Sequence, residues 1–186
     1  MSSDVLELLR AAGGYISGEK MAERLGVTRA AVWKKIAALR DAGYDISSAP
    51  RSGYVLRSSP DRLIETEITR GLATRLIGQK VICYDAVNST NLVLKDLARA
   101  GAEDGTVVVA DSQGTGRGRM ERAFFSPPGK GIWVSILLRP TFLPQDAPKC
   151  TLMAAVAVAR AMEKFGLRAA IKWPNDIMYD GRKLVG

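Results

Sequence analysis

The sequence predicts an α+β protein that folds as two units. Residues 3–57 carry the pattern of three short helices followed by a β-hairpin. Ser58-Ser59-Pro60 interrupts that pattern, and beyond it strand and helix patterns alternate without an internal repeat. We therefore expect a first domain at residues 1–60 and a second domain, built on a largely antiparallel or mixed sheet, at residues 61–186.

The helices of the first domain are delimited by residues that suit helix ends. An amphipathic helix is predicted over residues 3–12. Ser17 and Thr28 suit the N-caps of two further helices, because their hydroxyls can accept hydrogen bonds from the first turn. Short strands at residues 45–47 and 54–56 then form the hairpin.

The second domain is predicted from changes in hydrophobic period. Helices are expected at residues 63–72, 90–100 and 147–165, and strands at residues 79–84, 106–110, 132–138, 168–173, 177–179 and 182–185. The alanine-rich helix at 147–165 is apolar enough to be buried. Asp180-Gly181 is a tight-turn signal between the last two strands.

The composition excludes several classes of function. The 186 residues are 47% hydrophobic and 25% charged, which is typical of a globular protein. The longest apolar stretch, Leu152–Ala159, is too short to cross a bilayer and the N-terminus has no signal-peptide pattern, so we expect a cytoplasmic protein. Without histidine there is no Ser-His-Asp triad, and Cys83 and Cys150 are not spaced for zinc.

The net charge of +8 favours an anionic partner. Within residues 28–57, six cations stand against two acids. The cations are Arg29, Lys34, Lys35, Arg40, Arg51 and Arg57. This segment is therefore a candidate surface for a polyanion.

The order of elements in the first domain resembles the winged helix-turn-helix family of DNA-binding domains. In such domains one helix enters the major groove and neighbouring cations contact phosphates. The resemblance implies DNA contacts by Thr28, Arg29, Trp33, Lys34 and Arg51. Two alternatives stay open: a helical bundle with a solvated basic face, and packing of Trp33 against the hairpin or the next domain.

Residues 111–131 form a long segment rich in glycine and arginine between two apolar strands. Compact domains rarely keep a loop of this length without a function. Its glycines let the backbone approach a ligand, and the guanidinium groups of Arg117, Arg119 and Arg122 suit carboxylate or phosphate. The segment matches neither a Walker A loop nor a Rossmann turn. It predicts an anion site, with an unspecific basic loop as the alternative.

Two shorter motifs add polar groups. Asn88-Ser89-Thr90-Asn91 lies at a predicted strand-to-helix junction, where hydroxyls and helix amides can bind a polar ligand. The alternative is that Ser89 or Thr90 is only an N-cap. Lys172 and Lys183 lie in apolar strands, where an ammonium group needs an anion unless the strand is an exposed edge.

Together these segments resemble the catalytic domain of biotin protein ligases, and the whole chain resembles the bifunctional type that is also an operon repressor. The motifs that carry the resemblance are residues 88–91, 113–119 with Arg122, 125–127, 172–176 and 181–186. The chain departs from the family pattern at Glu121, where glycine is usual, and at Phe124, where tryptophan is frequent. The resemblance also implies further strands and a small barrel beyond Gly186, so we expect residues 61–186 to be a truncated catalytic domain.

The resemblance implies an ATP-dependent ligase that needs Mg²⁺. Biotin and ATP would form biotinyl-5'-AMP, and a lysine of biotin carboxyl carrier protein would then take the biotinyl group. Biotin binding is assigned to Ser89, Thr90, Gln113, Gly116, Arg117, Arg119 and Lys183. Nucleotide binding is assigned to Arg117, Arg119, Arg122, Asn175 and Asp176. Arg119 and Lys183 are the expected catalytic residues, and Asp176 the expected Mg²⁺ ligand.

The same resemblance implies operator DNA as a second partner. It further implies a homodimer when biotinyl-adenylate is bound, and no membrane partner. A DNA-binding regulator with an inactive ligase half is the alternative. A lipoate-type ligase is disfavoured, because the Gly-Arg-Gly-Arg loop and the Lys-Trp-Pro-Asn-Asp segment are biotin-type features.

Overall fold

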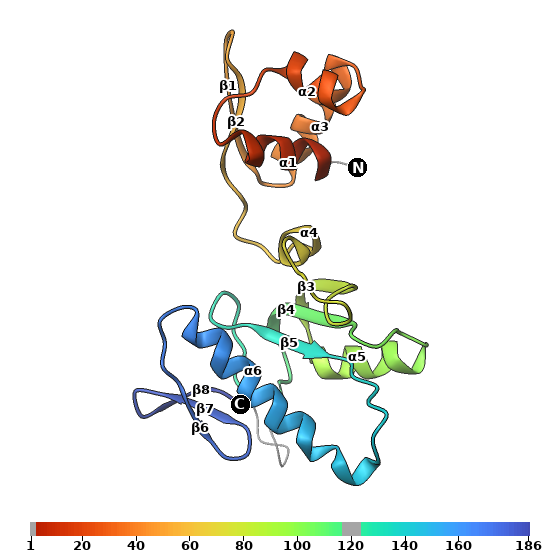
Figure 1. Ribbon diagram of the computed structural model, residues 1–186, viewed down its shortest axis with the longest axis vertical. Coiled ribbons are helices and arrows are strands. Elements are labelled where there is room, and N and C mark those ends of the chain that lie inside the picture. Colours follow the sequence, from red (N-terminus) through yellow and green to blue (C-terminus); the bar gives the residue numbers. More distant parts are fainter. Residues whose placement is uncertain (1–2, 117–123) are drawn as a thin grey trace. The chain divides into compact units, whose positions relative to one another are not determined.

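The computed structural model describes residues 3–116 and 124–186. The chain divides into two compact units, Met1–Leu72 and Ala73–Gly186, drawn in Figure 1. The first unit therefore extends beyond the domain boundary that we predicted at residue 60.

The first unit contains the predicted three helices and hairpin, followed by a short fourth helix. Its elements are α1 (Ser3–Ala12), α2 (Gly18–Leu25), α3 (Arg29–Asp41), β1 (Asp45–Ala49), β2 (Gly53–Ser58) and α4 (Glu65–Thr69). Both predicted N-caps are formed: the Ser17 hydroxyl accepts a hydrogen bond from the Lys20 amide at 3.1 Å, and Thr28 accepts one from Ala31 at 3.2 Å.

The core of the first unit lies where the apolar faces of α1, α2 and α3 meet the antiparallel β1–β2 hairpin (Figure 1). Its buried side chains are Val5, Leu6, Leu9, Ile16, Met21, Ala22, Val32, Ile36, Leu39, Tyr44 and Ile46. Ile16 also exchanges two backbone hydrogen bonds with Tyr54, both at 2.9 Å, which ties the α1–α2 connection to the hairpin.

Helix α4 belongs to the first unit because its side chains bind that unit. The Glu67 carboxylate contacts Arg10 of α1 and accepts a hydrogen bond from the Tyr44 hydroxyl. Ile64, just before α4, packs against the core. Residues 61–72, which we expected to open the second domain, are held by these contacts.

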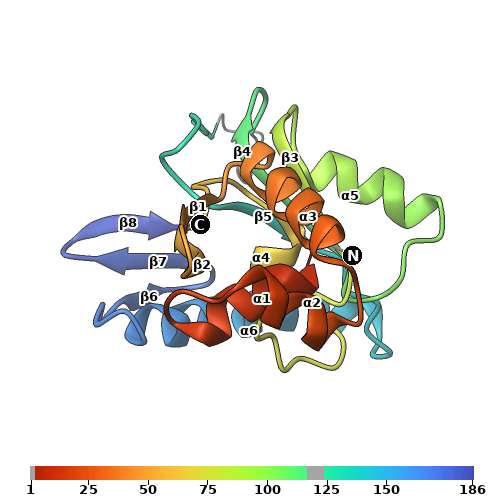
Figure 2. The same cartoon turned by 90° about the horizontal axis from the view of Figure 1, so that it is seen from above.

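The second unit begins with a three-stranded sheet and one covering helix. Its elements are β3 (Val81–Val87), α5 (Thr90–Arg99), β4 (Val107–Gln113) and β5 (Trp133–Ile136). β3 and β4 are parallel and β4 and β5 antiparallel, so the predicted mixed sheet is confirmed. The run Val107–Ala110 is buried in the central strand, and α5 lies against the sheet (Figures 1 and 2).

A second, antiparallel sheet follows in the same unit. Its elements are the 3₁₀ turn η2 (Pro144–Asp146), α6 (Pro148–Glu163), β6 (Ala170–Lys172), β7 (Asp176–Tyr179) and β8 (Arg182–Val185). The β7–β8 connection uses Asp180 and Gly181 with φ of 49° and 71°, as the tight-turn signal predicts. Figure 2 shows α6 beside these strands.

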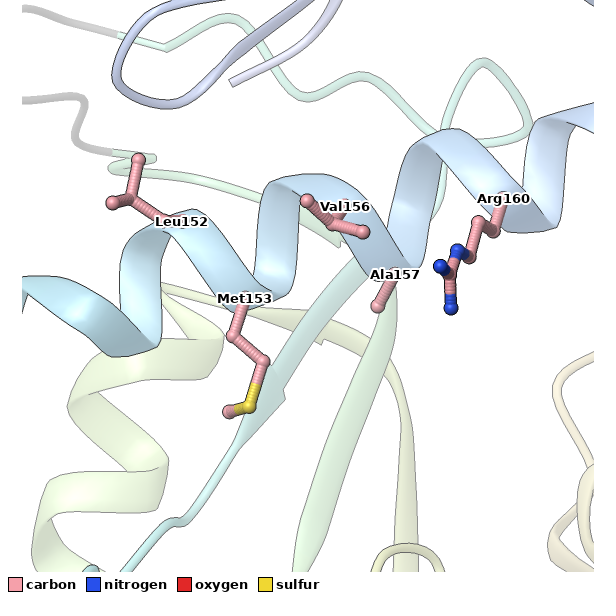
Figure 3. Close-up of a pocket in the computed structure, with 5 residues that line it drawn as sticks. All are labelled: Leu152, Met153, Val156, Ala157 and Arg160. Atoms are coloured by element: carbon pink, nitrogen blue, oxygen red, sulfur yellow. The ribbon is translucent and has the colours of Figure 1, made fainter.

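The prediction that the alanine-rich helix is buried was wrong. Ala155 is the one buried residue of α6, whose main contacts are with β6, β7 and the neighbouring η2 turn. Leu152, Met153, Val156, Ala157 and Arg160 line a shallow hollow on its surface (Figure 3). α6 is the longest helix among the described residues. Neither it nor any other helix there has the length and hydrophobicity of a transmembrane span.

Candidate functional site

The first unit carries an open groove of about 730 Å³ on its basic side. Three elements form its walls: the start of α2, the first turns of α3, and the β1–β2 hairpin. The lining residues are Ser17, Gly18, Glu19, Arg29, Ala30, Trp33, Ser48, Ala49, Pro50, Arg51, Gly53 and Tyr54. The groove thus brings together Arg29, Trp33 and Arg51 from the predicted DNA-binding set.

The six cations of residues 28–57 divide into two groups. Lys35 lies 3.9 Å from the Asp4 carboxylate, the Arg40 guanidinium donates to the Ile46 carbonyl at 2.9 Å, and Arg57 stacks on and bonds to Tyr15. These three support the fold of the unit. Arg29, Lys34 and Arg51 have no ion pair or hydrogen bond with any described residue, so they remain available to an outside anion.

The hairpin tip presents Arg51 in an unusual backbone conformation. Residues 49–52 form a turn closed by a 3.2 Å bond from the Ser52 amide to the Ala49 carbonyl, with Pro50 and Arg51 in the middle. Arg51 has φ of 65°, which a residue with a Cβ rarely adopts. A turn with proline second normally takes glycine or asparagine at this third position, so the arginine is kept at a conformational cost.

The second unit brings together several predicted biotin-site residues where β3 and β4 end and α5 begins. The Gln113 side-chain oxygen accepts two hydrogen bonds from Thr90, one from the amide at 2.8 Å and one from the hydroxyl at 3.1 Å. Ser89 occupies the N-cap position and is buried, yet its side chain makes no capping bond. The structure therefore does not support the alternative that Ser89 is only a helix cap.

Two further hydroxyls complete this network. The Gln113 amide group donates to Ser126 Oγ at 3.2 Å, and Ser126 donates to the Phe124 carbonyl at 3.0 Å. Thr90 Oγ1 lies 2.9 Å from Ser135 Oγ. Because the single Thr90 proton is given to Gln113, Ser135 must donate to Thr90. Thr90 and Ser126 are each only 4% exposed, while Gln113 and Ser135 are partly buried, so water has limited access to this network.

Ser135 was not among the residues predicted for the site. It lies on β5, opposite Val108 of β4, within an otherwise apolar strand. A lone serine in such a strand is the signal that could have found it, because a hydroxyl that packs among apolar residues needs a hydrogen-bond partner.

Gly116 fixes the base of the arginine-rich loop. A Cβ at this position would lie 2.5 Å from the Phe124 carbonyl oxygen and 2.7 Å from Ser126 Oγ, so only glycine fits. The Phe124 amide donates to the Gly116 carbonyl at 2.7 Å, which joins the two ends of the loop beside Gln113. Phe124 also packs edge-on against Trp133, with ring centroids 6.0 Å apart. The predicted Arg117, Arg119 and Arg122 lie outside the described residues.

A second polar cluster lies on the β6–β8 sheet. Lys183 Nζ is 2.8 Å from Asp176 Oδ1, and the Asn175 side-chain amide donates to the same carboxylate at 3.3 Å. The structure therefore brings together Asn175, Asp176 and Lys183. They belong to a different sheet from the Thr90–Gln113 network.

The sequence left two settings open for Lys172 and Lys183, an ammonium group that meets an anion and a lysine on an exposed strand. Every residue of β6 is exposed, and the Lys183 side chain is 46% exposed. Their strands belong to a three-stranded sheet against which α6 packs at β6 and β7, but both lysine side chains still reach solvent. Lys172 therefore fits the exposed-strand alternative, whereas Lys183 is partly exposed and also meets an anion, Asp176.

Comparison with known proteins assigns both units. Residues 2–55 match an HTH domain, and residues 83–186 match the biotin/lipoate A/B protein ligase family. The whole chain is 45% identical to the bifunctional ligase/repressor BirA of Bacillus subtilis and covers 58% of it. It is 36% identical to the Escherichia coli protein of the same name, with 96% of this chain and 54% of that protein aligned.

Among solved structures, a biotin protein ligase from Aquifex aeolicus in complex with biotin and ATP aligns with 56% of this chain and 44% of its own, at 33% identity and a TM-score of 0.49. The chain thus spans somewhat more than half the length of the curated relatives it matches. The ligase-family match alone covers more than half of the chain, and it contains the Thr90–Gln113 network and the Lys183–Asp176 pair. The chain therefore belongs to the biotin/lipoate A/B protein ligase family, with an N-terminal HTH domain.

Proposed function

We propose that this chain is part of an ATP-dependent biotin ligase that also acts as a biotin-responsive transcriptional repressor. The observation that carries the ligase proposal is the buried network of Thr90, Gln113 and Ser126 beside the base of the arginine-rich loop. Biotin has a polar ureido head and an anionic tail. A pre-organised, largely buried set of amide and hydroxyl groups suits the head, and cations suit the tail.

The first step needs no enzyme nucleophile. A biotin carboxylate oxygen attacks the α-phosphorus of ATP, the bond to the bridging oxygen breaks, and pyrophosphate leaves. Both reactants are anions, so the chain contributes by orienting them and by neutralising charge in the transition state. Ser89, Thr90, Gln113 and Gly116 would hold the ureido head. Arg117, Arg119 and Arg122 would cover the carboxylate and the phosphates.

Lys183 and Asp176 would act as an exchangeable pair. The ammonium group of Lys183 binds Asp176 at 2.8 Å, and both side chains are partly exposed to solvent. An arriving carboxylate or phosphate can compete for Lys183, because an exposed ion pair is only weakly favourable. Lys183 would then stabilise the reacting oxygens while Asn175 keeps its hydrogen bond to Asp176.

Asp176 would be the protein ligand of Mg²⁺ in this cluster. The described residues contain no group of three or more acidic, cysteine or histidine side chains that could coordinate the ion without water or substrate. Mg²⁺ commonly binds one or two carboxylates together with water and substrate phosphates. Asp176 would supply the carboxylate, and the ion would neutralise phosphate charge when bound.

In the second step a lysine amine of a carrier protein attacks the acyl carbon of biotinyl-5'-AMP, an amide bond forms, and AMP leaves. The proposed partner is biotin carboxyl carrier protein. For the repressor role, the free cations Arg29, Lys34 and Arg51 and the groove beside them support operator DNA as the ligand. A homodimer formed with bound biotinyl-adenylate, and a cytoplasmic location, complete the proposal.

Mass spectrometry after incubation with biotin, ATP and Mg²⁺ tests the ligase. We expect biotinyl-5'-AMP and pyrophosphate to appear, and a biotinylated carrier lysine when carrier protein is added. Binding to DNA without any adenylate would favour the alternative, a DNA-binding regulator with an inactive ligase half.

A further inference from the structure

We propose that Trp33 recognises the 5-methyl group of thymine when the first unit binds DNA. The side chain would then set part of the sequence preference, in addition to the non-specific attraction of the cations around it. This inference rests on the proposed DNA binding and names one contact within it.

The position of Trp33 on α3 points its ring at the groove. It is the fifth residue of the helix, one turn after Arg29. A helical side chain leans toward the N-terminus and covers the preceding turn, so the indole lies over Arg29 and Ala30. All three residues line the groove. The N-terminal turns of a recognition helix are the part that meets base edges.

The setting of Trp33 separates it from the core residues of the same helix. Val32, Ile36 and Leu39 are buried, whereas the Trp33 side chain is 59% exposed. Its indole nitrogen has no hydrogen bond to any residue in the described part of the chain. The hairpin lines the same groove but leaves more than half of the ring exposed, so the ring is not buried by packing against the hairpin.

The chemistry of the major groove selects the partner. Base edges there present hydrogen-bond donors and acceptors, and one apolar group, the thymine methyl. An indole offers a broad apolar surface and a single donor, so the methyl is the group that it fits best. Arg29 beside it is free to bond to a neighbouring base edge or phosphate. Ala30 adds a second small apolar surface on the same turn.

The test removes the methyl group and nothing else. The chain is first used to select duplexes from a random double-stranded DNA library. Each thymine of a selected duplex is then replaced singly by deoxyuracil, which keeps base pairing and the O4 acceptor. Affinities are measured for the wild-type chain, for Trp33→Ala, and for Phe165→Ala. Phe165 is 80% exposed and lies in the other unit, so this variant is the matched control.

We expect wild type and Phe165→Ala to lose about fourfold in affinity at one or more thymine positions, the amount that burial of one methyl group predicts. Trp33→Ala should bind the thymine and deoxyuracil duplexes equally well at those positions. The proposal is overturned if no deoxyuracil substitution weakens wild-type binding, or if Trp33→Ala remains equally sensitive. If no duplex is enriched at all, the proposed DNA binding itself fails and this contact fails with it.

Discussion

The guanidinium group of Arg10 in α1 contacts both carboxylate oxygens of Glu67 in α4, at 2.5 Å and 2.7 Å, across 57 residues of sequence. The Tyr44 hydroxyl donates to the same carboxylate at 2.6 Å. Burial by itself would raise the pKa of Glu67, but the hydrogen bonds from Arg10 and Tyr44 and the charge of Arg10 outweigh it and hold this pKa below its usual value. This cluster fixes the segment after the hairpin onto the HTH unit.

Glu67→Gln should destabilise the first unit by about 1–2 kcal/mol. The Arg10 and Glu67 side chains are only 14% and 17% exposed, so the change removes the nearer anion of a partly buried guanidinium, which keeps only the exposed Glu7. The cost therefore lies between those of surface and buried pairs. Urea unfolding measures the difference. Glu7→Gln is the control, since Glu7 also contacts Arg10 but is 59% exposed, and it should change stability by less than about 0.5 kcal/mol.

The contribution of Glu67 should disappear in acid. A carboxylate whose pKa is lowered by folding stabilises the fold above its ordinary pKa of 4.5, and that stability is lost as the pH falls through the folded pKa. The difference in unfolding free energy between wild type and Glu67→Gln should therefore be full at pH 7 and shrink below about pH 4. A difference that stays constant from pH 7 to pH 3 would contradict the ion-pair explanation.

Gly116→Ala should open the base of the arginine-rich loop. Its Cβ would collide with the Phe124 carbonyl and Ser126, and backbone cannot move aside cheaply, so we expect a loss of about 1–3 kcal/mol in stability and weaker biotin binding. Gly114→Ala is a control two residues away. Its Cβ would meet Asn88 at an ordinary 3.6 Å, and its thermal unfolding should match the wild type.

Thr90→Val tests the buried network directly. The substitution keeps the shape of the side chain but removes the hydrogen bonds of the buried Thr90 hydroxyl to Gln113 and Ser135, and the loss of such bonds costs about 1–2 kcal/mol. Unfolding experiments should show this loss, and calorimetry should show weaker binding of biotin. Thr90→Ser, which retains the hydroxyl, should recover most of the biotin affinity. Equal biotin affinity in all three proteins would remove Thr90 from the site.

Lys183→Gln should slow adenylate formation by about 10²-fold or more, the effect expected when one group that stabilises transition-state charge is removed. Pyrophosphate release gives the rate. Arg182→Gln is the matched control, because successive residues of β8 point to opposite faces of the strand. If both variants lose the same activity, a general loss of positive charge explains the effect better than a specific contact.

Local sequence patterns determined most of the secondary structure of this chain. The hydroxyls of Ser17 and Thr28 cap the helices that their positions predict, and the Asp180–Gly181 turn has the left-handed backbone that its residues favour. The predicted helices and strands occur in the predicted order, with α4 much shorter than residues 63–72. These features depend on neighbours within a few residues, so they can be predicted from the local sequence.

Tertiary structure alone decided how distant side chains combine. No local sequence pattern predicts that Glu67 binds Arg10 or that Ser135 bonds to Thr90. The same holds for the ion pair between Lys183 and Asp176. Hydrophobic pattern likewise could not decide that α6 keeps one buried residue, because burial depends on which elements pack against a helix. Hydrogen bonds and ion pairs act over about 3–4 Å, so they form only after the chain has brought their groups together, whatever their separation in sequence.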